Sequence, residues 1–412
     1  MDPLSGIVRP IAVVALAFGL AVGGIALDAA PGTAAGEDAA ADTAAAYLAT
    51  LQFESGGFDA PDGFAGFLTA DVAFALAQAG QTGASWDPAE ALAAVRGVAT
   101  NGNDALDYLD DQAEGAFGPL SSGKAAQLVI LAVAVGLDPA AFDPQGDGAI
   151  DLVAAIDAGA PSFGSIYTAP LGALADVALG RGVPTPVRDF IVSQQGADGS
   201  FGDAPDTTGL AIAALVAAGE SVDAAPVADA LAYLATQHAA NGGFVSFGST
   251  SANSTAMAML GIVAAGYDLG SSCWRDTAAP DLVAPSYVSP ASYLLGLQSG
   301  SGAIADPADF DAGFATAQAV QGLLARFVPP VIAAPRDCAA NATTTTTSGV
   351  ASSTTMAVVG QATTSSLAAT ATTDQLPVTG RASGNLVAVA ILLVVAGSGL
   401  LAGARHRTRR AT

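Results

Sequence analysis

Residues 190–201 read FIVSQQGADGSF, and this stretch is the clearest indication of the fold in the sequence. An aromatic and an aliphatic residue open it, a glutamine follows at Gln194 or Gln195, and a glycine-containing turn ends at Phe201. Residues 207–218 come next and are rich in alanine and other small apolar residues, a composition typical of a packed helix. The stretch therefore predicts a helical hairpin, in which a tight turn at glycine joins one helix to a second, alanine-rich helix.

The same pattern recurs along the chain. In four of five copies the opening aromatic precedes the closing hydrophobic residue by eleven positions, and a degenerate sixth copy ends at Phe163. Repetition on this scale indicates that hairpins stack side by side around a shared core. The opening aromatics are Tyr47, Tyr108, Phe190, Tyr233 and Tyr293, and the glutamines that follow them are Gln52, Gln112, Gln194 or Gln195, Gln237 and Gln298.

This pattern resembles the repeat family of squalene cyclases and protein prenyltransferases, whose units read aromatic, aliphatic, three residues, Gln, a short spacer, Gly, any residue, and Trp or Phe. Residues 190–201 match it best. The resemblance implies an all-α fold, an α/α toroid of two concentric rings of helices over residues 37–338. It implies less about activity, because the same architecture also serves cobalamin carriers and complement-type domains.

Composition limits the possible partners. Hydrophobic residues make up 51% of the chain and aromatic residues only 6%, which favours close-packed helices. The formal net charge is −24, so the surface would repel the phosphates of nucleic acid. We therefore expect no nucleic-acid partner.

The N-terminal residues have the layout of a secretory signal peptide. Arg9 precedes an apolar run from Ile11 to Leu27, and small residues follow. We assign residues 1–36 to this signal, with an uncleaved membrane anchor as the alternative, because the run is long for a signal.

The C-terminal residues carry a pentapeptide, an apolar stretch at 386–404 and a basic tail at 405–412. The stretch is long enough for a transmembrane helix, and its flanking arginines favour a cytoplasmic tail. Residues 339–375 are rich in Thr, Ser and Ala, which predicts an extended stalk. The pentapeptide consists of Leu376, Pro377, Val378, Thr379 and Gly380.

This order resembles the cell-wall sorting signal of Gram-positive surface proteins, whose pentapeptide reads Leu-Pro-any-Thr-Gly. The resemblance implies that a sortase cleaves after Thr379 and joins that residue to a peptidoglycan precursor. The protein would then stand in the cell wall, after an intermediate held in the membrane. The alternative is a tail anchor with a chance pentapeptide.

Catalytic motifs of the toroid families are missing from the sequence. Squalene-type cyclases use an Asp-any-Asp-Asp acid, whereas Asp107, Asp110 and Asp111 have a different spacing and fit a solvated helix face. Protein prenyltransferases hold zinc with Asp, Cys and His, yet no Asp-any-Cys pair exists and His238 falls in a repeat, where a structural role is favoured. We predict no metal and no cofactor.

Residues 143–151 read DPQGDGAID and resemble the first nine positions of an EF-hand calcium loop. The twelfth position, where a bidentate carboxylate belongs, is Ala154. An ordinary turn is therefore favoured over a calcium site.

Polar residues near the starts of the second helices are the candidates for a ligand-binding rim. They are either helix N-caps, which we favour, or a polar rim around a central funnel. Cys273 and Cys338 are a candidate disulfide pair for an oxidising compartment, against two free thiols. The candidate rim consists of Asp71, Lys124, Asp206, Asn253 and Asp311.

These observations favour a wall-anchored surface protein that binds or adheres to an unknown surface ligand without catalysis. The alternatives are a terpenoid cyclase-like or other lipid-modifying enzyme, and a carrier for a small cofactor such as cobalamin. A desolvated carboxylate in an aromatic pocket would favour the enzyme. A deep pocket would favour a carrier over an adhesin.

Overall fold

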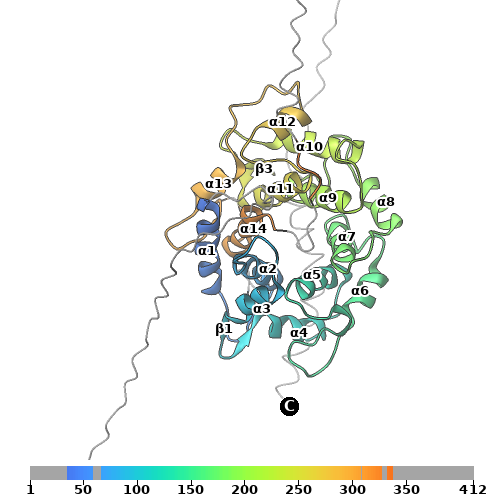
Figure 1. The fold of residues 1–412 in the computed structure, drawn as a ribbon, viewed down its shortest axis with the longest axis vertical. Helices are drawn as coiled ribbons and strands as arrows, with labels where there is room; N and C mark the ends of the chain where they lie inside the picture. Colours follow the sequence, from blue (N-terminus) through green and yellow to red (C-terminus); the bar gives the residue numbers. More distant parts are fainter. Residues whose placement is uncertain (1–34, 59–65, 308, 327–331, 337–412) are drawn as a thin grey trace, which may run out of the picture. The chain divides into compact units, whose positions relative to one another are not determined.

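A computed structural model describes residues 35–58, 66–307, 309–326 and 332–336, and this part of the chain is mostly helical (Figure 1). Within it, no helix is both long and apolar enough to cross a membrane. The predicted signal peptide lies almost wholly outside the described residues. The stalk, the pentapeptide, the apolar stretch at 386–404 and the basic tail lie entirely outside them.

Six helices pack in sequence order around a closed inner ring. Each contacts the next, and the last contacts the first, because α14 packs against both α11 and α2 (Figure 1). The predicted α/α arrangement of residues 37–338 is present in the described part of this range. The inner helices are α2 (Thr69–Ala79), α5 (Ser122–Ala134), α7 (Ala169–Ala178), α9 (Pro205–Ala217), α11 (Ala252–Ala264) and α14 (Ala312–Leu324).

A second set of helices packs on the outside of this ring, and each bears a buried stripe on the side that faces it. Shorter elements fill the connections. The outer helices are α1 (Ala35–Ala49), α4 (Ala105–Ala113), α6 (Leu152–Gly159), α8 (Thr185–Ser193), α10 (Ala225–Gln237) and α13 (Pro290–Leu297). The connecting elements are α3 (Pro88–Arg96), η1 (Pro139–Ala141), α12 (Cys273–Ala278), and the antiparallel pairs β1 (Ala99–Thr100) with β2 (Asn103–Asp104) and β3 (Phe244–Ser246) with β4 (Ser249–Ser251).

Small residues explain why the inner helices approach so closely. A Cβ atom added to Gly209 of α9 would lie 2.1 Å from the backbone oxygen of Met257 of α11. The same contact seen from α11 places a Cβ on Gly261 at 2.6 Å from the Cα atom of Gly209. Larger side chains here would push the backbones apart, so the high alanine and glycine content is a packing requirement.

Threonines tie each repeat turn to the inner helix that follows it. Four backbone N–H groups at the ends of turns donate hydrogen bonds to threonine Oγ1 atoms, at 2.9 to 3.0 Å. These threonines are fully buried, so they satisfy donors that water cannot reach. The pairs are Phe58 with Thr69, Phe201 with Thr208, Phe244 with Thr255, and Ile304 with Thr316.

Three of the repeat glutamines, Gln52, Gln195 and Gln298, join neighbouring hairpins. Gln195 Nε2 donates to the carbonyl of Gly199 in its own turn, at 3.0 Å, and to that of Pro226 at the next outer helix, at 2.8 Å. Gln52 bonds to Gly56 and Val98 in the same manner. The structure thus selects Gln195 over Gln194.

The fourth copy departs from the predicted pattern. Gln237, four positions after Tyr233, is half-buried and bonds to Thr236, while His238, five positions after Tyr233, takes the joining position. His238 Nε2 lies 3.1 Å from the carbonyl oxygen of Val288, and the ring stacks on Tyr287. Burial, followed by the charge of Arg275, lowers the pKa of His238 to about 4, so the imidazole is neutral near pH 7.

The ring closes through the same joining bond. Gln298 Nε2 donates to the carbonyl of Ala40 in α1, at 2.8 Å, and so links the last outer helix to the first. Cys273, at the start of α12, takes part in a disulfide. Its predicted partner Cys338 lies outside the described residues.

Candidate functional site

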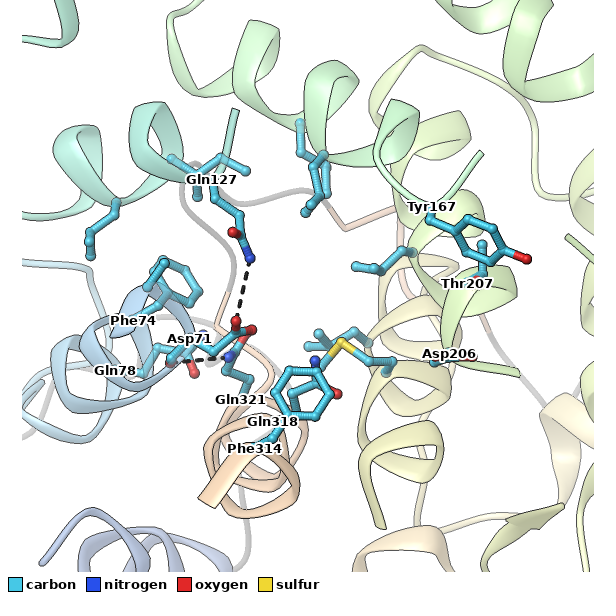
Figure 2. A pocket seen from close by; sticks show the side chains of 18 of the residues that line it. Asp71, Phe74, Gln78, Gln127, Tyr167, Asp206, Thr207, Phe314, Gln318 and Gln321 are labelled. Carbon is cyan, nitrogen blue, oxygen red and sulfur yellow. Dashed lines mark hydrogen bonds between the residues drawn. The ribbon is translucent and has the colours of Figure 1, made fainter. Parts of the chain in front are cut away.

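A cavity of about 300 Å³ lies at the centre of the inner ring and is bordered by all six inner helices. Its walls are mostly aliphatic and aromatic (Figure 2). The volume is at the lower end of the range for small-molecule sites. The apolar lining consists of Phe67, Ala70, Phe74, Ile130, Leu131, Leu171, Leu174, Leu210, Met257, Leu260 and Phe314.

Helical periodicity places these residues on one face of each helix. Phe67, Asp71, Phe74 and Gln78 follow one another at intervals of three or four residues at the start of α2 and along it, and all four border the cavity. Residues 314, 318 and 321 of α14 do the same. The cavity is therefore built from single faces of otherwise buried helices.

Asp71 is a carboxyl of the cavity wall on which several neighbouring polar groups act. Burial raises the pKa of its carboxyl, and the charge of Lys124 and hydrogen bonds from Gln318 and Gln127 oppose that rise. Gln127 Nε2 donates to Asp71 Oδ2 at 3.4 Å (Figure 2). Desolvation thus favours the protonated acid, while the neighbours stabilise the anion.

Asp206, near the start of α9, borders the cavity from the side of the ring opposite Asp71 (Figure 2). Burial raises the pKa of this carboxyl too, against hydrogen bonds from backbone N–H groups. Its Oδ1 atom is buried and has no hydrogen-bond partner among the described residues. A ligand that donates a hydrogen bond would satisfy this acceptor.

Two glutamines add further acceptors of the same kind. Gln78 Oε1 and Gln318 Oε1 are buried and also lack partners within the described part of the chain. Both residues border the cavity. The apolar walls therefore present acceptor atoms at a few fixed points, which suits a mostly apolar molecule with a hydroxyl or similar donor.

The predicted rim is brought together only in part. Asp71 and Asp206 border the cavity, and Lys124 acts on Asp71 through its charge. Asp311 is an N-cap whose carboxylate accepts from the N–H of Phe314 at 2.8 Å, as the capping interpretation predicts. Asn253 bonds to Ser251 Oγ at 2.6 Å, and neither it nor Asp311 is among the lining residues.

Sequence reasoning missed most of the lining. The missed polar residues are Gln78, Gln127, Tyr167, Gln318, Gln321 and Arg326. The available signal was amide side chains at helical spacing inside apolar helices, as at Gln318 and Gln321. Because each inner helix is apolar nearly all round, periodicity alone did not reveal which face points to the centre.

One prediction about the acidic cluster on α4 is wrong. Asp110 is not part of a solvated face, because its side chain is fully buried beneath residues 143–148. Asp111 is exposed, as predicted. None of Asp107, Asp110 and Asp111 borders the central cavity.

No family model matches the chain, and no curated protein matches it either. Among solved structures, it is similar to the type II terpene cyclase MstE from Scytonema, at 16% identity and a TM-score of 0.49 over 71% of this chain and 98% of that one. A variant of the same enzyme in complex with geranylgeranyl dihydroxybenzoate is similar at 16% identity and a TM-score of 0.46, over 70% of this chain and 97% of that chain. The chain thus has a distant structural similarity to type II terpene cyclases.

Proposed function

We propose that the toroid binds an isoprenoid-like apolar molecule in its central cavity and that Asp71 serves as the acid of a reaction on it. The observation that carries the proposal is a desolvated carboxyl in a cavity with aliphatic walls and three phenylalanine rings. The two parts, binding and proton transfer, are separable by experiment.

The size and chemistry of the cavity favour this proposal over the other candidate functions. A cavity of about 300 Å³ suits a flexible hydrocarbon chain, whereas the corrin ring and nucleotide of cobalamin need a larger space. An adhesin that used only its outer surface would not require buried acceptor atoms in an apolar centre. The residues that bind would be the apolar wall, with Asp206 and Gln318 as acceptors.

The surroundings of Asp71 suit proton donation. Desolvation raises the pKa of the carboxyl and so favours its protonated form. Transfer of that proton to an alkene carbon would form a C–H bond from the π electrons and leave a carboxylate and a carbocation. Lys124, Gln127 and Gln318 would stabilise the carboxylate, and the rings of Phe74 and Phe314 would stabilise the cation. The carbocation would later lose a proton to form a new alkene, and return of a proton to the Asp71 carboxylate would restore the acid.

The test uses the purified protein with geranylgeraniol, an isoprenoid alcohol with a hydroxyl donor. Calorimetry measures binding, and mass spectrometry after chromatography identifies cyclic or isomerised products. Asp71→Asn should bind the alcohol within about threefold of the unchanged protein and give no product. Asp42→Asn, an exposed residue of α1, is the matched control and should behave like the unchanged protein.

The outcomes separate the candidate functions. Binding without turnover in the unchanged protein would favour a carrier, and turnover that survives Asp71→Asn would remove Asp71 as the acid. Failure to bind any isoprenoid alcohol would shift the function to adhesion through the outer surface.

We also propose that the toroid is displayed on the cell wall. The support is the order of pentapeptide, apolar stretch and basic tail in residues 376–412. Incubation with a sortase and a peptidoglycan-like amine should cleave the chain between Thr379 and Gly380 and attach the amine to Thr379. The variant Thr379→Ala should remain uncleaved. A chain that stays whole with active sortase would contradict the proposal.

A further inference from the structure

Three aspartates meet on the outer side of the ring, away from the central cavity. Asp110 comes from α4, while Asp143 and Asp147 come from the loop between η1 and α6. One carboxylate oxygen of each lies within 4.8 Å of those of the other two. Asp110 is fully buried, Asp143 is half-buried and Asp147 is exposed, so the group reaches from the interior to solvent.

Backbone hydrogen bonds fold the loop around Asp143. Its Oδ1 atom accepts from the N–H groups of Gly146, Asp147 and Gly148, at 2.7, 3.0 and 3.3 Å. Phe142 and Ile150 close the loop with a two-residue bridge. The loop therefore has a defined shape in which Asp143 and Asp147 face a common point.

Gln145 fastens this loop to α4. Its backbone N–H donates to Asp110 Oδ2 at 3.0 Å, and its Nε2 atom donates to the carbonyl of Asp107 at 2.9 Å and to Asp111 Oδ1 at 3.1 Å. These bonds bring Asp110 to the loop across 35 positions of sequence. The side chain of Gln145 therefore bonds to α4 and does not point towards Asp143 and Asp147. The third carboxylate near these two is that of Asp110 on α4.

The second carboxylate oxygen of Asp110 has no such partner. Asp110 Oδ1 is buried and lacks a hydrogen-bond partner among the described residues. Burial first, and then the charges of Asp143, Asp147 and Glu114, raise the pKa of Asp110 to about 6, against the bond from Gln145. A buried acceptor among like charges is costly unless a cation or a proton joins it.

We propose that Asp110, Asp143 and Asp147 bind one calcium ion. Two oxygens bound to the same Ca²⁺ at about 2.4 Å can be at most about 4.8 Å apart, and the three carboxylates satisfy this limit. Residues 143–151 carry the spacing of an EF-hand loop, but Ala154 stands where the last carboxylate belongs. Asp110 supplies the missing carboxylate from the neighbouring helix.

The choice of ion follows from the donors. Carboxylate oxygens are hard ligands, which disfavours the metals that prefer sulfur or imidazole. An irregular set that combines one buried and one exposed carboxylate suits the flexible coordination of Ca²⁺ better than the strict octahedron of Mg²⁺. The ion would join the loop to α4 and relieve the repulsion around Asp110.

The test titrates CaCl₂ into the purified, EDTA-treated protein by calorimetry, with MgCl₂ as the comparison. We expect one calcium per chain, with a dissociation constant of about 10⁻⁴ to 10⁻³ M, the range of extracellular calcium modules. Asp110→Asn should weaken binding by about tenfold or more, because it removes one ligand charge. Asp42→Asn, which changes the same charge at an exposed site, should bind like the unchanged protein.

A second measurement guards against misfolding. In EDTA, Asp110→Asn should melt no lower than the unchanged protein, because the amide oxygen still accepts from Gln145 and the repulsion is gone. Lost calcium binding with retained stability would support the proposal. It would be overturned by an absence of calcium binding at about 10 mM, by binding of Mg²⁺ in preference to Ca²⁺, or by equal affinity in Asp110→Asn.

Discussion

Asp71 in the central cavity and Asp110 on the outer ring are two aspartates taken out of water by the same fold. Burial is the first cause of a raised pKa in both. The charges of the groups next to them differ in sign. Around Asp71, the amino group of Lys124 and amide donors lower the pKa, whereas around Asp110 the other charges are carboxylates and raise it.

The difference shows that desolvation alone does not assign a role to a carboxyl group. At Asp71 the surroundings can stabilise the anion that remains after a proton leaves, which is what an acid requires. At Asp110 the surroundings repel that anion, which is what a cation site requires. The sign of the neighbouring charge decides between the two.

The largest expected effect comes from disabling the two regions separately. Leu171→Trp should fill the cavity and weaken geranylgeraniol binding by at least about tenfold, or about 1.4 kcal/mol, with calcium binding unchanged. Asp110→Asn should weaken calcium binding and leave geranylgeraniol binding unchanged. Calorimetry with both ligands on both variants measures this, and coupled losses would show that the two regions are one unit.

A smaller effect is expected in the pH dependence of stability at Asp71. The pKa of Asp71 is raised in the folded state above the unfolded value of about 3.9, so stability falls as pH rises through this interval. Asp71→Asn has no titrating group at this position, so its free energy of unfolding should not fall in this way. It should be more stable than the unchanged protein at about pH 8, and the difference in free energy of unfolding should shrink towards about pH 4. Urea unfolding at both pH values measures the difference. A pH-independent difference would contradict the assignment, and Asp42→Asn is the control.

The smallest expected effect concerns Lys124. Its charge lowers the pKa of Asp71, so Lys124→Met should raise that pKa further. Carbon NMR of the Asp71 carboxyl, followed through a pH titration, measures the shift directly. Arg188→Met, on outer helix α8, removes an equal charge elsewhere and should leave the titration of Asp71 in place. An unmoved titration in Lys124→Met would show that the lysine has no part in the acid.

The fold was predictable because its signal is local and repeated. The hairpin at residues 190–201 contains its own turn and joining glutamine, and further copies of the same sequence pattern predict further hairpins. His238 stands five positions after Tyr233, where Gln195 stands five positions after Phe190, and its ring nitrogen contacts a backbone carbonyl as the glutamine amide does, which agrees with the structural role predicted for it.

The two sites were less predictable, for different reasons. Asp71 and Asp206 stood out as polar residues at helix starts, but their shared cavity requires the closed ring. The resemblance of residues 143–151 to an EF-hand loop was visible in the sequence, yet its incomplete pattern favoured a plain turn. In the proposed calcium site Asp110 would supply the missing carboxylate from another helix, and a linear motif does not contain such a residue.

The bond from Gln298 to Ala40 has a consequence for how the chain reaches this structure. It joins residues 258 positions apart, so the first and last hairpins meet only after the intervening hairpins are in place. Each hairpin can form early from local contacts, but the closing contact must wait for most of the chain to be synthesised. Until then, α1 and α2 expose an apolar side that α14 later covers, which makes the half-made ring the stage most open to aggregation.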